Sequence, residues 1–91
     1  MGEELHIAGI VVHARPERVQ QVAGAILGLA GAEIHATSAD GKLVVTLEAA
    51  SARDIATRME EMQQFEAVLS ASLVYQHNES LEAMMEEVEW Q

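Results

Sequence analysis

Histidine is the residue type in this chain best suited to hold a metal ion, and four histidines are spread along its 91 residues. Metal sites on a helix use two histidines four residues apart, and no pair among His6, His13, His35 and His77 has that spacing. The chain has no cysteine, which excludes thiolate zinc sites, iron–sulfur clusters, disulfides and a catalytic thiol. We therefore expect structural or surface roles for the histidines, with no metal and no cofactor.

Catalysis needs a nucleophile with a base, or an acid and a base in one cleft. Ser70 and Ser72 lie in a strand-like stretch of small residues, where the sequence places no histidine in their expected neighbourhood. The carboxylates fall mainly on predicted helix surfaces and in the C-terminal segment. We therefore expect that the protein is not an enzyme.

The formal net charge of −10 argues against a nucleic-acid partner, because that affinity depends on lysines and arginines that neutralise phosphates. RNA-binding sheets also stack bases on exposed rings, and the only aromatic residues here are Phe65, Tyr75 and Trp90. The acidic balance favours a cationic partner instead. The acidic start of the chain and the lack of a membrane-spanning apolar run predict a cytoplasmic protein without membrane insertion.

Any binding site must be positioned by residues 5–13, which are apolar at both strand parities. Such a run predicts a strand that is covered on both faces. Further strands are expected at residues 32–37, 42–48 and 67–77, with Asp40-Gly41 as a hairpin turn.

Two helices are expected between these strands. The first follows Pro16 and repeats Val19, Val22 and Ile26 on one side, and the second begins at Ser51 with Asp54 in capping-box spacing.

The order β-α-β-β-α-β over residues 5–77 predicts an α+β fold, the ferredoxin-like sandwich. Its four-stranded antiparallel sheet has the order 4-1-3-2, with two helices on one face. We expect this domain at residues 1–78, followed by an acidic tail at residues 79–91. The tail has five glutamates and no basic residue, and a helical apolar stripe is formed by Leu81, Met84, Met85 and Val88.

Two helices cover only one face of such a sheet, so the other face is free to bind a partner. Strand parity places on the helix-covered side Leu43, Val45 and Leu47 of the third strand and Leu69, Ala71 and Leu73 of the fourth, with Tyr75 on the same parity. It assigns to the free face a shallow floor of small and β-branched residues, on which an amphipathic helix can lie flat. The predicted floor comprises Ile7, Gly9, Val11, Val44, Thr46, Ser70, Ser72 and Val74.

Three alternatives remain open from the residues alone. The face is a solvent-tolerant sheet surface, or it is covered by the chain's own Leu81–Val88 segment and uncovered by a partner. The third alternative is a small-molecule-sensing or sheet-to-sheet dimerisation domain, since ferredoxin-like folds often pair through their sheets.

Three stretches of the chain resemble the NapD family, cytoplasmic chaperones of the catalytic subunit of the periplasmic nitrate reductase. They are GIVVHARPER at residues 9–18, GKLVVTLEA at 41–49 and ASLVY at 71–75, followed by Gln76 and His77. The resemblance covers about residues 5–78 and excludes the acidic tail.

The resemblance implies a ferredoxin-like protein that binds the twin-arginine signal peptide of the nitrate reductase precursor. We expect the protein to be a monomer, because a net charge of −10 discourages self-association. It also implies that this binding restrains export until cofactor insertion and folding are complete. In that family the signal peptide is bound as a helix against the sheet, which agrees with the face assigned by parity. The sequence leaves open the affinity, the register and the direction of the bound peptide.

Overall fold

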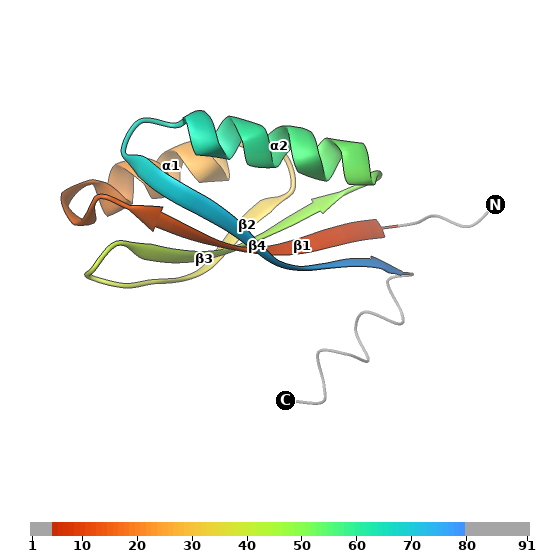
Figure 1. Cartoon of the computed structure of the whole chain (residues 1–91), viewed down its shortest axis with the longest axis horizontal. Coiled ribbons are helices and arrows are strands. Elements are labelled where there is room, and N and C mark those ends of the chain that lie inside the picture. The colour runs from red at the N-terminus through yellow and green to blue at the C-terminus, as the bar shows by residue number, and fades with distance from the viewer. Residues whose placement is uncertain (1–4, 80–91) are drawn as a thin grey trace, which may run out of the picture.

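A computed structural model describes residues 5–79, which form one sheet with two helices packed on one of its faces (Figure 1). The acidic stretch from residue 80 onward, with its predicted helical stripe, lies outside the described residues. In chain order the elements are β1 (Leu5–Ala14), the 3₁₀ turn η1 (Pro16–Arg18), α1 (Val19–Leu27), β2 (Ala32–Thr37), β3 (Lys42–Ala49), α2 (Ala52–Gln64) and β4 (Val68–Glu79).

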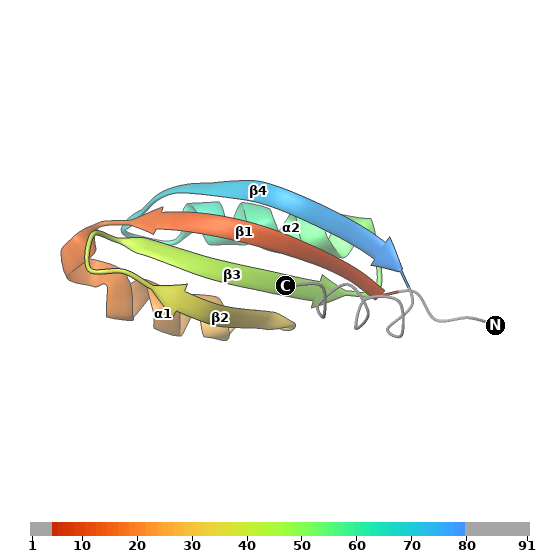
Figure 2. The same ribbon diagram turned by 90° about the horizontal axis from the view of Figure 1, so that it is seen from below.

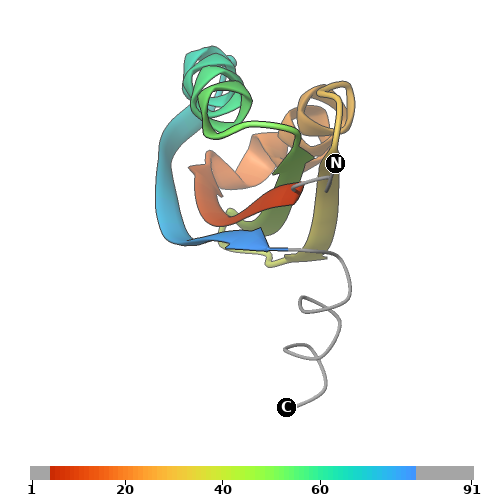
Figure 3. The same cartoon turned by 90° about the vertical axis from the view of Figure 1, so that its right-hand side faces the viewer.

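The strands lie in the order β2-β3-β1-β4, and every neighbouring pair is antiparallel (Figure 2). This is the predicted order 4-1-3-2 counted from the opposite edge, so the predicted fold is confirmed. β1 and β3 occupy the centre of the sheet. The end view shows both helices on the same side of it (Figure 3).

The core lies between the sheet and the helices, and it follows the alternation of side chains along the two central strands. In β3, Leu43, Val45 and Leu47 are fully buried, whereas the residues between them are exposed or half-buried. β1 contributes Ala8, Ile10, Val12 and Ala14, α1 contributes Val19, Val22 and Ile26, and α2 contributes Ile55 and Met62.

The second helix begins where the capping-box spacing predicts. The Ser51 hydroxyl accepts a hydrogen bond from the backbone N–H of Asp54 at 3.1 Å, which satisfies one of the free donors of the first turn. The helix ends at Gln64, and the half-buried side chain of Phe65, which follows it, packs against the core.

Glycine is required at the hairpin between β2 and β3. Gly41 has a φ of +105°, and a Cβ atom there would lie 2.2 Å from the Ala14 carbonyl oxygen. The Gly41 carbonyl also accepts a 2.7 Å hydrogen bond from the Ala14 N–H. The predicted Asp40-Gly41 turn therefore also joins the hairpin to the end of β1.

Two bulges in the edge strand β4 interrupt the expected alternation of side chains between the two faces. In β4, the partner of β1 moves from Tyr75, opposite Gly9, to Leu73, opposite Ile10, so that Val74 is an extra residue. A second shift near the start of β4 leaves Leu69 without a partner in β1. Each such bulge reverses which face the following residues occupy.

Candidate functional site

The side of the sheet turned away from α1 and α2, which we name the open face, has no helix on it among residues 5–79 (Figures 1 and 3). Its side chains alternate with the buried ones along each strand. Strand register arranges them in four rows across β3, β1 and β4. In order these are Glu48–Ile7–His77, Thr46–Gly9–Tyr75, Val44–Val11–Ser72 and Lys42–His13–Ser70.

Seven of the eight residues predicted for the floor lie in these rows. They are Ile7, Gly9, Val11, Val44, Thr46, Ser70 and Ser72. Val44 is 43% exposed, and the serines are exposed, whereas Ile7, Val11 and Thr46 are half-buried by their neighbours. The rows bring these residues together into one surface, and their role in binding stays a prediction.

The eighth residue, Val74, does not continue the row of Ser70 and Ser72. It is the extra residue of the β4 bulge and is 62% exposed. Strict alternation of β4 placed Val74 on the open face and Tyr75 beneath the helices, and the bulge reverses this assignment for Tyr75. Tyr75 lies opposite Gly9 instead, so a large side chain stands on a face expected to carry only small ones.

The Tyr75 ring lies directly on Gly9. A Cβ atom at position 9 would come within 2.3 Å of Cε2 and 2.7 Å of Cδ2 of that ring. Gly9 is buried although it faces away from the helices, and Tyr75 keeps 44% of its surface exposed. A glycine inside a strand often marks a close approach of another group, and this was the only sequence signal for the contact.

Tyr75 also contacts the next ring on the same face. Its centroid lies 5.3 Å from that of His77, with the two planes tilted by 58°. Tilted aromatic pairs at this separation are mutually attractive. The open face therefore has an aromatic ridge along β4, beside the apolar floor of β1 and β3.

A polar group borders the floor on the other side, at β2. His35 Nε2 lies 2.8 Å from the Thr46 hydroxyl oxygen and 3.8 Å from a carboxylate oxygen of Glu33. The β2–β3 register shifts at His35, which is how this side chain reaches Thr46. This floor thus has aromatic residues along β4 and polar residues along β2.

Two residues of the edge strand β4 that were expected under the helices are exposed. Leu69 is the extra residue of the second bulge, whereas Leu73 lies opposite Ile10, on the helical side of the sheet. Ala71 is buried as predicted, but Leu69 is 67% exposed and Leu73 is 47% exposed. Val68, opposite Ala14, packs against the core in place of Leu69. The Gln63 side chain of α2 donates a 3.1 Å hydrogen bond to the Ala71 carbonyl oxygen on this edge strand.

The expectation that no histidine neighbours the serines is wrong, since His13 lies directly opposite Ser70. Both residues are exposed on the open face, where residues 5–79 do not shield them from water as the walls of a catalytic cleft would. A hollow of about 410 Å³ lies elsewhere, between residues 16–20 and 37–39, and its lining residues include no histidine. Within residues 5–79 no three metal-ligating side chains gather into a possible metal site. His6 and His77 do come from neighbouring positions of the sheet, since the strand partner of His6 is Asn78, the residue that follows His77.

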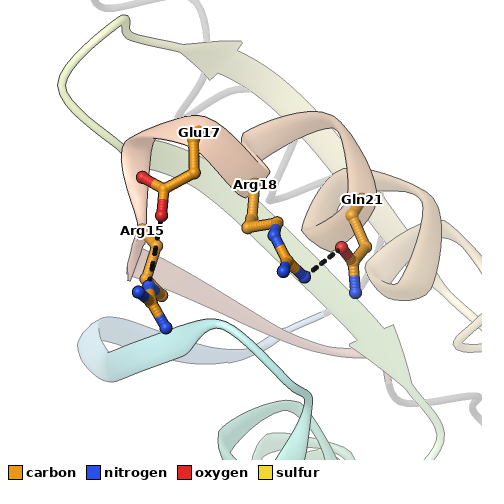
Figure 4. Close-up of polar contacts among 4 residues, drawn as sticks. All are labelled: Arg15, Glu17, Arg18 and Gln21. Atoms are coloured by element: carbon orange, nitrogen blue, oxygen red, sulfur yellow. Dashed lines mark hydrogen bonds and ion pairs between the residues drawn. The ribbon is translucent and has the colours of Figure 1, made fainter.

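The arginines after β1 are engaged locally. Arg15 Nε lies 3.3 Å from a carboxylate oxygen of Glu17, and Arg18 donates a 2.9 Å hydrogen bond to the Gln21 side chain (Figure 4). All four residues are exposed at the start of the first helical segment. Their contacts join neighbours within that segment and not residues of the open face.

The turn next to Lys42 holds a carboxylate with a shifted pKa. The Ser38 hydroxyl donates a hydrogen bond to Asp40, and this lowers the pKa of the Asp40 carboxyl below its usual value. The positive charge of Lys42 acts in the same direction. The Ser38 hydroxyl oxygen also accepts a hydrogen bond from the Lys42 backbone N–H at 3.1 Å, which ties the turn together.

Similar proteins share both the sequence and this architecture. A protein from Paracoccus pantotrophus named chaperone NapD is 38% identical over 72 residues, which are 79% of this chain but less than two thirds (63%) of that relative. The chaperone NapD of Escherichia coli K12 is 30% identical over 74 residues, covering 80% of this chain and 85% of that protein.

The solution structure of the E. coli Tat proofreading chaperone protein NapD matches with a TM-score of 0.77 and 28% identity, over 89% of this chain and 85% of that one. Among residues 5–79 no helix has the length and apolar character needed to span a membrane. The NapD protein family matches residues 5–80, which include every described element. This chain belongs to the NapD family.

Proposed function

We propose that this protein is a cytoplasmic chaperone that binds the twin-arginine signal peptide of a periplasmic nitrate reductase precursor. Binding restrains export of the precursor until its cofactor is inserted and its folding is complete. Membership of the NapD family supports this function, together with the likeness to a Tat proofreading chaperone. The structural observation that best supports the proposed function is an apolar, shallow sheet face with no helix on it among residues 5–79.

The open face suits a helical peptide because the side chains at its centre are mostly apolar and short. Val11 and Val44 lie side by side in its middle, next to the small side chain of Ser72. A helix laid on this floor removes roughly 600 Å² of apolar surface from water, worth on the order of 15 kcal/mol gross. Association and peptide ordering cost about 4–15 kcal/mol, which leaves room for micromolar to nanomolar affinity.

Tyr75 adds an amphipathic side wall to this floor. Tyrosine gives a large contact area with few rotatable bonds, and it is enriched at protein interfaces for that reason. Its ring stands on Gly9 beside the valines, so a helix on the floor packs against one edge of the ring.

The charge of the chain also suits this partner. A net charge of −10 attracts a peptide that carries arginines, mainly by speeding encounter and by orienting the peptide. We therefore expect the affinity to fall as salt is raised, since exposed charges are screened over about 8–10 Å.

One pair of variants tests where the peptide binds. Val44→Asp puts a charge in the centre of the open face, and Leu27→Asp makes the same change at a 58% exposed leucine of α1, on the helical side. Both sites are already accessible to water, so both variants should fold, which circular dichroism verifies. Calorimetry with a synthetic signal peptide should give a weakening of about tenfold or more for Val44→Asp only.

Equal affinities for the two variants would place the peptide away from the open face. Sheet-to-sheet dimerisation predicts a different result in gel filtration. In that case the unmodified protein elutes as a dimer and Val44→Asp converts it to a monomer.

A further inference from the structure

The charged side chains of the open face are separated by sign along the sheet. Glu48 lies in the row of Ile7, at the end where β1 begins, and Lys42 lies in the row of His13, at the opposite end. Glu33 stands opposite Thr46 on β2, in the Glu48 half of the face. We call the half with Glu33 and Glu48 the carboxylate end and the half with Lys42 the lysine end.

The two ends are far enough apart to act separately on a bound peptide. Lys42 and Glu48 are six positions apart along β3, a distance of about 20 Å at roughly 3.3 Å per residue. This is about two and a half times the Debye length at physiological salt. A helix of about 13 residues has the same length, at about 1.5 Å per residue.

The chain beyond the described residues joins at the carboxylate end. Leu5 and Glu79 are strand partners there, so residues 1–4 and 80–91 are both attached to that end. These segments contain six glutamates (Glu3, Glu4, Glu82, Glu86, Glu87 and Glu89) and no lysine or arginine. These acidic segments join the described chain at its carboxylate end, and their own positions lie outside the described residues.

Export signal peptides have their charges in a fixed order, with a basic segment before an apolar stretch of about 7–15 residues. In a helical signal peptide the basic residues therefore sit at the N-terminal end. The backbone dipole adds partial positive charge to that end and partial negative charge to the other. Side-chain charge and helix dipole thus favour the same orientation on a face that carries Glu33 and Glu48 at one end and Lys42 at the other, where the Asp40 carboxylate in the adjoining turn offsets part of the lysine charge.

We propose that the signal peptide binds in one direction, with its arginines over the carboxylate end and the C-terminal end of its apolar helix toward Lys42. The peptide then runs in the same direction as β1. Glu48 and Glu33 are the positioning residues for the arginines, while Val11, Val44 and Ser72 hold the apolar part. This orientation rests on the proposed function. In the reverse direction, the arginines would face Lys42 and the negative helix end would face Glu48.

The direction can be measured with the unmodified protein and a spin-labelled synthetic signal peptide. A nitroxide placed before the arginines should broaden the amide signals of Ile7 and Glu48 more than those of His13 and Lys42. A nitroxide after the apolar stretch should do the opposite. The reversed pattern would overturn the orientation and leave the proposed function intact, whereas a peptide that binds without broadening either set would refute the binding face itself.

A charge reversal tests which end meets the arginines. At low salt, Glu48→Lys should weaken binding about three- to tenfold, an effect typical of a partly exposed charge pair. Glu60→Lys makes the same change on the exposed side of α2 and should leave the affinity within about twofold. With a peptide whose arginines are replaced by glutamine, Glu48→Lys should have no effect.

Weakening by Lys42→Glu in place of Glu48→Lys would contradict the proposed direction. Equal weakening by Glu48→Lys and Glu60→Lys would mean that only the net charge matters, and this would also overturn the assignment of the arginines to the carboxylate end.

Discussion

The contact between Gly9 and Tyr75 predicts that Gly9→Ala changes the free energy of unfolding in opposite directions in two proteins, one that has Tyr75 and one in which Tyr75 is replaced by alanine. Adding a methyl group to Gly9 requires the Tyr75 ring to move, because three ring atoms lie 2.3–2.8 Å from the position of the new Cβ. Real Cβ contacts are essentially never shorter than 3.0 Å, so the nearest ring atom, now at 2.3 Å, must move by about 0.7 Å or more, or the ring must rotate away. It can do so, since Tyr75 is 44% exposed.

The size of the effect follows from the surface that the ring covers. A tyrosine buries about 150–250 Å² when fully enclosed, so a half-covered ring accounts for about 100 Å². At about 25 cal/mol per Å² this is at most about 2.5 kcal/mol, and partial repacking reduces the loss to about 1–2 kcal/mol. Alanine itself gains about 0.5–1 kcal/mol over glycine in a strand.

We therefore expect Gly9→Ala to lower the free energy of unfolding by about 0.5–1 kcal/mol in the wild-type background, where the clash outweighs the glycine gain. In a Tyr75→Ala background the same change should raise it by about 0.5 kcal/mol, because no ring is left to displace. Urea denaturation of the four proteins gives the coupling energy, expected at about 1–1.5 kcal/mol.

Gly24→Ala in α1 is the matched control. Nothing lies within 4 Å of a Cβ at that site, so the substitution should stabilise the protein by about 1 kcal/mol in both backgrounds. A Gly9–Tyr75 coupling below about 0.3 kcal/mol would refute the contact and with it the assignment of Tyr75 to the open face.

Three further predictions concern the frame that holds this face. Ser51→Ala should lower the free energy of unfolding by about 1 kcal/mol through loss of the α2 cap, and an equal effect of Ser51→Gly would contradict that cause. Gly41→Ala should lower the free energy of unfolding by more than this, about 2–3 kcal/mol, because it combines a φ of +105° with a clash against the Ala14 carbonyl. An unchanged midpoint of urea denaturation would refute this prediction. The lowered pKa of Asp40 means that its ionised carboxylate stabilises the fold at pH values above the pKa of this group in the unfolded chain, and this stabilisation is lost as the pH falls through the lowered pKa. Ser38→Ala should raise the pKa of Asp40 in a carboxyl NMR titration, because the hydroxyl that donates to the carboxylate is removed. An unchanged pKa of Asp40 would contradict this role of the hydroxyl.

The sequence predicts the fold well because most of the chain obeys local rules. β3 alternates without interruption, so Leu43, Val45 and Leu47 were assigned to the core and Val44 and Thr46 to the other side. Ser51 and Asp40-Gly41 carry specific capping and turn chemistry, which fixes element boundaries.

The errors arise at the edge strand β4, where bulges interrupt the pattern. Val74 and Leu69 are extra residues whose neighbours give no local sign of a bulge, and each one reverses the alternation. The sequence therefore assigned Tyr75 and Leu69 to the core side. The contact of Tyr75 with Gly9 depends on long-range strand register, which alternation along a single strand cannot predict.

The most direct test of the central proposal is an NMR titration of isotope-labelled protein with the cognate signal peptide. We predict that the amide signals of open-face residues Gly9, Val11, Val44, Thr46 and Ser72 shift most, together with Tyr75, while the exposed residues of α1 and α2 stay in place. Shifts confined to α1 and α2, with the open-face signals unchanged at saturation, would contradict the account.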